Sequence, residues 1–103
     1  MSGILIVTHK VRDYRTWKPV FDESEELRQQ YGLRNGWIAR NPEDANLVTV
    51  VLVCEDLNKA RLFMNLPNLR DAMQRGGVEG EAKVCLLEQV AEVRSPVTHP
   101  GSC

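Results

Sequence analysis

The sequence predicts an α+β fold with one antiparallel four-stranded sheet, in the element order β-α-β-β-α-β. Three observations lead to this fold. Residues 3–11 and 47–54 are apolar, β-branched runs typical of strands. Residues 14–31 repeat apolar side chains at helical spacing, and residues 57–75 form a second helical segment before the last strand. This order is the split βαβ, or ferredoxin-like, pattern.

The first strand is predicted at residues 3–11, GILIVTHKV, and is apolar on both faces. Alternation places one set of side chains together (Leu5, Val7, His9, Val11) and the other set opposite (Ile4, Ile6, Thr8). Residues 47–54, LVTVVLVC, are apolar on both faces as well. Helices on one side would leave the other sheet face bare, which is rare in a monomer. We therefore expect a homodimer that pairs through its sheet faces.

The first helix follows at once, and its start and end can be assigned. Asp13 can cap it by accepting the first free backbone N–H groups. Pro19 suits only a first turn, so we expect an opening turn at residues 14–18 and the main run after it. Gly32 ends the helix in a left-handed conformation. One stripe faces inward: Trp17, Val20, Phe21, Ser24, Leu27, Arg28 and Tyr31.

The middle of the chain forms a hairpin. Residues 33–40 are a weaker strand in which Gly36 marks a bulge or bend. Residues 41–46, NPEDAN, are a turn by composition. The strand at 47–54 completes the pair.

The remaining elements are a broken helix, a strand and a tail. Asp56 can cap the second helix, whose inner stripe holds Leu57, Ala60, Arg61 and Met64 beside Phe63. Pro67 interrupts it and opens a third helical run that ends at Arg75. The last strand is predicted at residues 82–90. Residues 1–92 then form the domain, and residues 93–103 form a tail.

Composition excludes several classes of function. A net charge of −1 does not supply the basic surface that nucleic acid requires. No apolar run approaches the roughly 20 residues of a membrane span, and the N-terminus does not resemble a signal peptide. We therefore expect a cytoplasmic protein.

The cysteines indicate neither a disulfide framework nor a metal motif. Their number is three and their spacing is wide, and Cys54 and Cys85 lie in apolar runs typical of buried, inert thiols. His99 and Cys103 are too few ligands for a structural metal site. No metal is expected.

Three stretches resemble a known family. They are VRDYRTWKPVFDE at residues 11–23, EDLNKARLF at 55–63 and PNLRDAMQRGGV at 67–78. They resemble the helices of small dimeric α+β barrel proteins, a superfamily grouped with antibiotic biosynthesis monooxygenases and with proteins labelled cyclases. The resemblance spans residues 3–90 and implies the ferredoxin-like fold and a dimeric barrel.

The resemblance also implies a range of activities. The superfamily includes cofactor-free monooxygenases acting on polyketide-like aromatics, isomerases and haem-degrading enzymes. Haem-degrading relatives supply a histidine from the second helix, and residues 56–66 contain none. We therefore expect no haem or other cofactor.

His9 is the candidate general base. A neutral imidazole with a pKa near about 6.5 can take a proton from an acidic phenol or enol at neutral pH. Tyr14 or Arg28 would orient the ligand. An inward arginine usually has a partner, which is a carboxylate either from the fold or from a ligand. The structural alternative is a histidine hydrogen-bonded near a strand end.

A flat aromatic ligand would be walled by five side chains: Trp17, Phe21, Trp37, Phe63 and Met64. Aromatic residues at helical spacing also serve as plain core. The sequence thus allows a cofactor-free monooxygenase, isomerase or cyclase acting on small aromatic molecules, or a non-catalytic ligand-binding or stress-related dimer. A cavity of roughly 300 Å³ or more that reaches His9 would favour the first.

Overall fold

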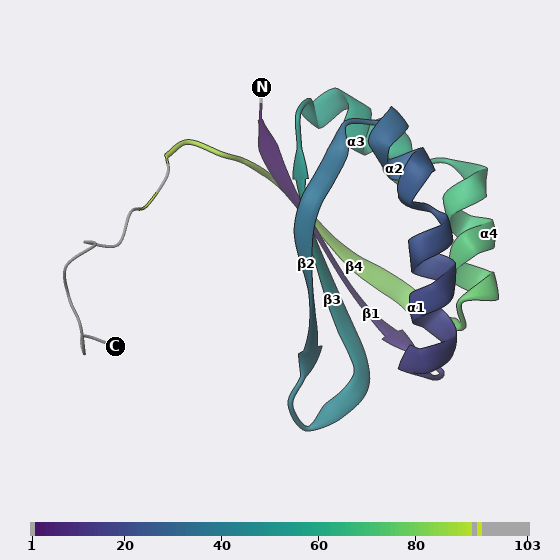
Figure 1. The fold of residues 1–103 in the computed structure, drawn as a ribbon. Helices are drawn as coiled ribbons and strands as arrows, with labels where there is room; N and C mark the ends of the chain where they lie inside the picture. Colours follow the sequence, from purple (N-terminus) through teal and green to yellow (C-terminus); the bar gives the residue numbers. More distant parts are fainter. Residues whose placement is uncertain (1, 92, 94–103) are drawn as a thin grey trace, which may run out of the picture.

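The computed structural model describes residues 2–91 and residue 93. Four strands form one sheet: β1 (Gly3–Val11), β2 (Leu33–Asn41), β3 (Asp44–Cys54) and β4 (Val78–Glu88). The helices are α1 (Tyr14–Glu23), α2 (Glu25–Gln30), α3 (Leu57–Met64) and α4 (Pro67–Arg75). The strand order is β2-β3-β1-β4, with every pair antiparallel. Figure 1 shows the helices on one side of the sheet, which confirms the predicted fold class.

The hydrophobic core lies between this sheet and the helices. On β1, Leu5 and Val7 are buried and pair with Leu52 and Val50 of β3. Their neighbours in sequence point to the opposite face and are only partly buried. The predicted alternation of the first strand is therefore confirmed.

The first helix departs from prediction at Pro19. Asp13 caps it as expected, accepting a hydrogen bond from the Arg15 backbone N–H at 3.0 Å. The helix then continues through Pro19 and breaks at Ser24. Trp17 and Phe21, on either side of the proline, stack at 5.0 Å between ring centroids. We attribute the unbroken helix to this packing, which compensates for the one backbone hydrogen bond that proline removes.

The hairpin between β2 and β3 is tighter than composition predicted. Its turn contains only Pro42 and Glu43, and β3 already begins at Asp44. Asn41 accepts a hydrogen bond from the Glu43 N–H at 2.8 Å, and Asp44 accepts one from the Asn46 N–H at 3.0 Å. These polar side chains bond to local backbone groups, so their composition reads as a longer loop.

The boundaries of β4 also differ from prediction. The strand starts at Val78, which pairs with Val11, and it ends at Glu88. Gly80, with φ of +69°, lies in its first part, near a register shift opposite β1. Glycine and charged residues have a low strand propensity, so no strand was predicted at these positions. Pairing with the central strand β1 outweighs that low propensity in the folded protein.

Several smaller predictions are settled by exposure. Cys54 is buried as predicted, but Cys85 is exposed, because β4 is an edge strand and this residue lies on the face away from the helices. Arg61 of α3 is exposed rather than inward. Val93 is the only described residue of the predicted tail, so His99 and Cys103 lie outside the described residues. None of the helices in the described part of the chain is long and apolar enough to cross a membrane.

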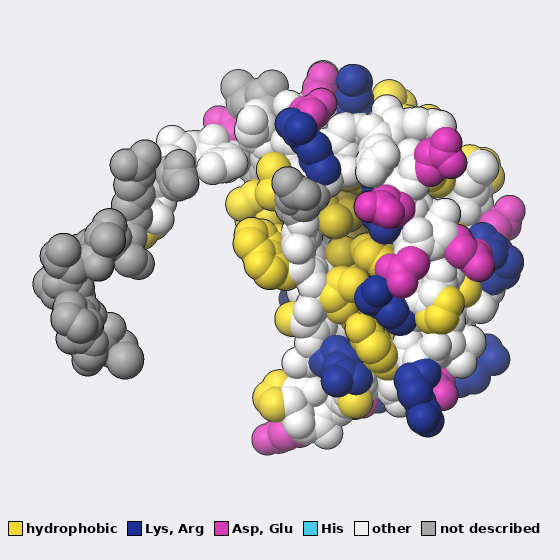
Figure 2. Space-filling model, viewed as in Figure 1, with side chains coloured by type: hydrophobic (Ala, Val, Ile, Leu, Met, Phe, Trp, Pro, Cys, Tyr) yellow, Lys and Arg dark blue, Asp and Glu magenta, His cyan; other side chains and the backbone are white. Residues whose placement is uncertain are grey.

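The sheet face away from the helices, here called the open face, is rich in apolar side chains. Ile4, Ile6 and Val51 are partly exposed there. Trp37 and Leu87 are 67% and 49% exposed. Figure 2 shows hydrophobic side chains gathered beside β2 on the side away from the helices.

Candidate functional site

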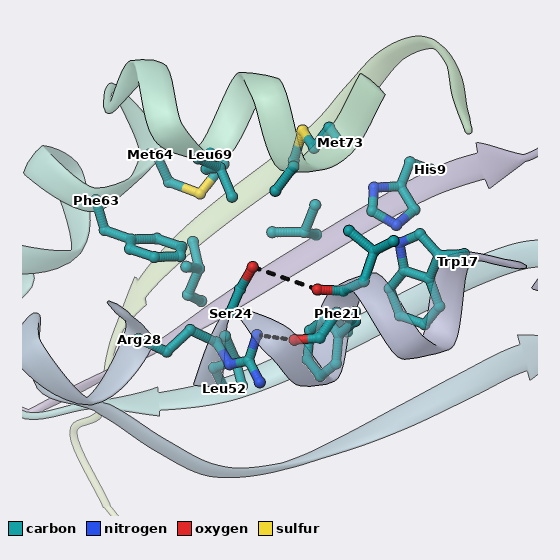
Figure 3. Close-up of a pocket in the computed structure, with 15 residues that line it drawn as sticks. His9, Trp17, Phe21, Ser24, Arg28, Leu52, Phe63, Met64, Leu69 and Met73 are labelled. Carbon is teal, nitrogen blue, oxygen red and sulfur yellow. Dashed lines mark hydrogen bonds between the residues drawn. The ribbon is translucent and has the colours of Figure 1, made fainter. Parts of the chain in front are cut away.

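A small inner cavity lies between the helices and the sheet. Its volume is about 60 Å³. The sheet supplies one wall and the four helices supply the others (Figure 3). Its lining is Leu5, Val7, His9, Trp17, Val20, Phe21, Ser24, Arg28, Val50, Leu52, Phe63, Met64, Leu69, Ala72 and Met73. Only three of these side chains are polar: His9, Ser24 and Arg28.

His9 reaches this cavity from β1 and is 5% exposed. Its ring meets Trp17 edge-on, with centroids 5.6 Å apart and an interplanar angle of 74°. Neither Nδ1 nor Nε2 has a hydrogen-bond partner within the described residues. Burial lowers the pKa of the His9 imidazole, so the ring is neutral at pH 7. His9 thus lines the cavity as a neutral imidazole whose two nitrogens are enclosed and without a partner among the described residues.

A row of aromatic rings leads away from His9 along α1. Trp17 stacks on Phe21 and lies 5.8 Å from the Tyr14 ring. Tyr14 in turn lies under the Arg40 guanidinium, whose carbon is 4.5 Å from the ring centroid. Tyr14 lines neither this cavity nor the cleft described next. The structure therefore does not bring Tyr14 to the site.

Arg28, at 8% exposed, lies at the boundary between the inner cavity and an outer cleft of about 250 Å³. The cleft is lined by Phe21, Glu25, Arg28, Gln29, Leu33, Arg34, Gly36, Trp37, Ile38 and Leu52. The Arg28 Nη1 donates a hydrogen bond to the Phe21 carbonyl at 2.7 Å. The guanidinium carbon of Arg28 lies 3.8 Å from the centroid of the Phe21 ring. Burial lowers the Arg28 pKa, while Glu25 and Asp22 raise it.

Comparison with solved structures identifies the fold. No protein-family model and no curated protein matches the sequence. A Bordetella bronchiseptica protein named for the antibiotic biosynthesis monooxygenases superposes with a TM-score of 0.72 at 12% identity, over 87% of this chain and 98% of that one. SnoaB, a cofactor-independent oxygenase from Streptomyces nogalater, superposes with a TM-score of 0.67 at 12% identity, over 95% of this chain and 98% of SnoaB. Rv0793 from Mycobacterium tuberculosis superposes with a TM-score of 0.67 at 11% identity, over 91% of this chain and 100% of Rv0793. The chain has the fold of these proteins.

Four of the five predicted wall residues line the inner cavity: Trp17, Phe21, Phe63 and Met64. Trp37 does not. It pairs with Val51 on the open face and borders only the outer cleft. The cause is the bulge predicted at Gly36. The register shifts between Arg34 and Gly36, and one extra residue moves every later side chain to the opposite face.

Sequence reasoning missed the contribution of α4 to the site. Leu69, Ala72 and Met73 line the inner cavity. Their helical spacing predicted an inward stripe, but a stripe does not distinguish a cavity wall from solid core. Among the described residues, no three histidine, cysteine, aspartate or glutamate side chains gather in a way that could hold a metal ion.

Proposed function

We propose that the protein binds a compact phenol or enol between its helices and sheet, and that His9 removes the ligand's acidic proton in a cofactor-independent reaction. The observation that carries this proposal is the pair of unpartnered nitrogens on a buried, neutral imidazole. An unpaired buried polar group costs about 1–3 kcal/mol, so a ligand that bonds it recovers that free energy. The row formed by Trp17 and Phe21 suits a flat ring.

The reaction begins with one proton transfer. A C–H or O–H proton passes to a nitrogen of His9 and leaves an enolate beside the imidazolium that forms, whose positive charge offsets that of the enolate. Reprotonation of the enolate at another carbon gives an isomer of the ligand, which is the reaction of an isomerase. Addition of the enolate carbon to dioxygen gives a hydroperoxide after protonation, and loss of water then leaves a carbonyl. Support for the second outcome comes from SnoaB, a cofactor-independent oxygenase with the same fold.

The volume of the site limits the ligand. The inner cavity alone, at about 60 Å³, is smaller than a ligand pocket of about 300 Å³. The outer cleft adds about 250 Å³ and shares Phe21, Arg28 and Leu52 as a border. A two-ring ligand therefore needs both spaces and a shift of those bordering side chains.

The same volume favours a second candidate function. A cavity of about 60 Å³ at His9 is the packed interior expected of a non-catalytic ligand-binding or stress-related dimer. In that case the His9 nitrogens stay enclosed and the ring serves as part of the core.

We further propose that two chains pair through their open faces. Trp37 and Leu87 expose 67% and 49% of their surface there, beside Ile4, Ile6 and Val51. A twofold interface would place these aliphatic residues against their own copies. Obligate dimers typically bury about 2,000 Å² of surface in total. At about 25 cal/mol per Å² of apolar area, the free energy gained by that burial is at least as large as the stability of a domain of this size.

The test of the chemistry is proton exchange on a simple substrate. The compact ketone 2-tetralone enolises at an acidic CH₂ next to its aromatic ring, and its exchange in D₂O is followed by proton NMR. Oxygen uptake is recorded in parallel. We expect wild-type protein to accelerate exchange and His9→Ala to reduce the acceleration by about 100-fold or more.

His99→Gln, which removes the other histidine, is the matched control and should retain the wild-type rate. Exchange by His9→Ala at the wild-type rate would contradict the assignment of the base. A wild-type rate no faster than buffer would favour the non-catalytic dimer.

A further inference from the structure

The outer cleft contains a cation without an acidic partner. Arg28 is 92% buried, yet none of the ion pairs in the described part of the chain includes it. Arginine stays charged in proteins and presents five N–H donors in a planar fork. Only one hydrogen bond to a described residue, that to the Phe21 carbonyl, uses these donors. A buried charge usually has a partner, which here remains to be supplied.

The unused donors of Arg28 are not fully enclosed by the protein, although the residue as a whole is buried. Its side chain borders both the inner cavity and the outer cleft. The fully enclosed side-chain nitrogens without a partner, among described residues, are those of His9 alone. In Figure 3 one Arg28 nitrogen meets the Phe21 carbonyl while another points away from it. The free edge of the guanidinium is therefore accessible from the cleft.

The rest of the cleft fits a flat, negatively charged molecule. Its volume is about 250 Å³, and Phe21, Ile38 and Leu52 give it apolar surface.

Two other charged residues border the cleft. Arg34 is 62% exposed at its side chain and is already paired with Glu55. Glu25, at the start of α2, is exposed. Neither forms an ion pair with Arg28, although the Glu25 carboxylate favours the charged form of Arg28 through space. Arg28 is thus the buried cation of the cleft, without an acidic partner at ion-pair distance among the described residues.

We propose that this cleft binds the carboxylate of a planar aromatic acid, with both carboxylate oxygens on the free edge of Arg28. A carboxylate matches the fork of arginine in a bidentate arrangement. The inference rests on the proposed function, because it assigns a second polar group to the same ligand: an acidic C–H or O–H near His9 and a carboxylate at Arg28. The predicted ligand is thus an aromatic hydroxy- or keto-acid.

The test compares an acid with its neutral isostere. Binding of 2-naphthoate and of 2-naphthamide to the wild-type protein is measured at pH 7 by calorimetry and by backbone amide NMR shifts. We expect naphthoate to bind about tenfold or more tightly than naphthamide and to shift signals of α2 and β2. Arg28→Gln should abolish this preference, and Arg28→Lys should lower it, since lysine cannot form the bidentate pair.

The control is Arg34→Gln, which removes a charge from the same cleft but leaves Arg28 in place. It should change the preference by less than about threefold. Circular dichroism monitors the folding of each variant, and the wild-type comparison stands even if Arg28→Gln unfolds. Equal binding of acid and amide by the wild type, or no binding of either at millimolar concentration, would overturn the proposal.

This result is distinguishable from failure of the proposed chemistry. Naphthoate has no acidic C–H or O–H besides its carboxyl group, so its binding tests the carboxylate site without the proton transfer assigned to His9. Naphthoate binding without exchange of 2-tetralone would retain the carboxylate site and reject the base.

Discussion

Replacing His9 with leucine is expected to stabilise the fold while removing the proposed base. The imidazole is 5% exposed and both of its nitrogens lack a partner among the described residues. Leucine has a similar volume, so it can occupy the same place beside Trp17 with no polar atom to satisfy. The substitution therefore removes a desolvation cost and leaves the apolar packing in place.

The magnitude follows from that cost. An unsatisfied buried polar group costs about 1–3 kcal/mol, and His9 has two such atoms on one ring. We expect the free energy of unfolding to rise by about 1–3 kcal/mol. For a domain of this size, each 1 kcal/mol shifts the melting temperature by about 4–8 °C.

The pH dependence gives a second measure of the same effect. Burial lowers the pKa of His9 in the folded protein, whereas the unfolded chain titrates near about 6.5. As the pH falls below that value, the unfolded chain takes up a proton that the folded protein does not. The free energy of unfolding therefore decreases, by at most about 1.4 kcal/mol per pH unit, until the folded pKa is reached. Above pH 6.5 His9 is neutral in both states, so its titration costs the folded protein no stability there.

The assay is urea denaturation followed by circular dichroism between pH 7.5 and 5, at one protein concentration because an oligomer would couple stability to concentration. The His9→Leu variant should be more stable at pH 7.5, and its advantage should widen below pH 6.5. A less stable variant whose pH profile runs parallel to that of the wild type would refute the reasoning. In that case ordered water already satisfies the ring.

Three further predictions concern the fold and the dimer. Val51→Asp places a charge on the open face and should give a monomer or an aggregate by light scattering. Val50→Asp, on the buried face, should instead abolish the folded circular dichroism spectrum; a well-behaved dimer of the Val51 variant would contradict the proposed interface. Gly36→Ala drives a Cβ against the Val51 carbonyl and should cost about 1–3 kcal/mol in urea denaturation, and an unchanged midpoint would argue against this close approach. Asp56→Ala removes the α3 cap, which accepts the Asn58 N–H at 2.8 Å, and should lower stability by about 1 kcal/mol, with Asp56→Asn retaining most of it.

Local chemistry explains which elements could be predicted. The Asp13 and Asp56 caps act over two residues and are written in the sequence beside the helices that they start. The alternation of β1 grouped His9 with Leu5, Val7 and Val11, since successive side chains of a strand point to opposite sides. That this set faces the helices was decided by the tertiary structure.

Packing between distant segments decided the rest. Without the bulge before Gly36, Trp37 would pair opposite Val50 and face the helices. The extra residue pairs it with Val51 instead and places it on the open face. Similarly, Cys85 is exposed because β4 is an edge strand, which the order of strands in the sheet determines.

The site shows the same division. By itself, the sequence determined the fold class, the inward stripe of α1 and the presence of His9 and Arg28 among apolar neighbours. Only the tertiary structure decided that the cavity at His9 is about 60 Å³, that both nitrogens of His9 lack partners, and that Arg28 borders a second space of about 250 Å³. Volume and hydrogen-bond satisfaction depend on side chains from several elements at once, so periodicity along one element cannot supply them.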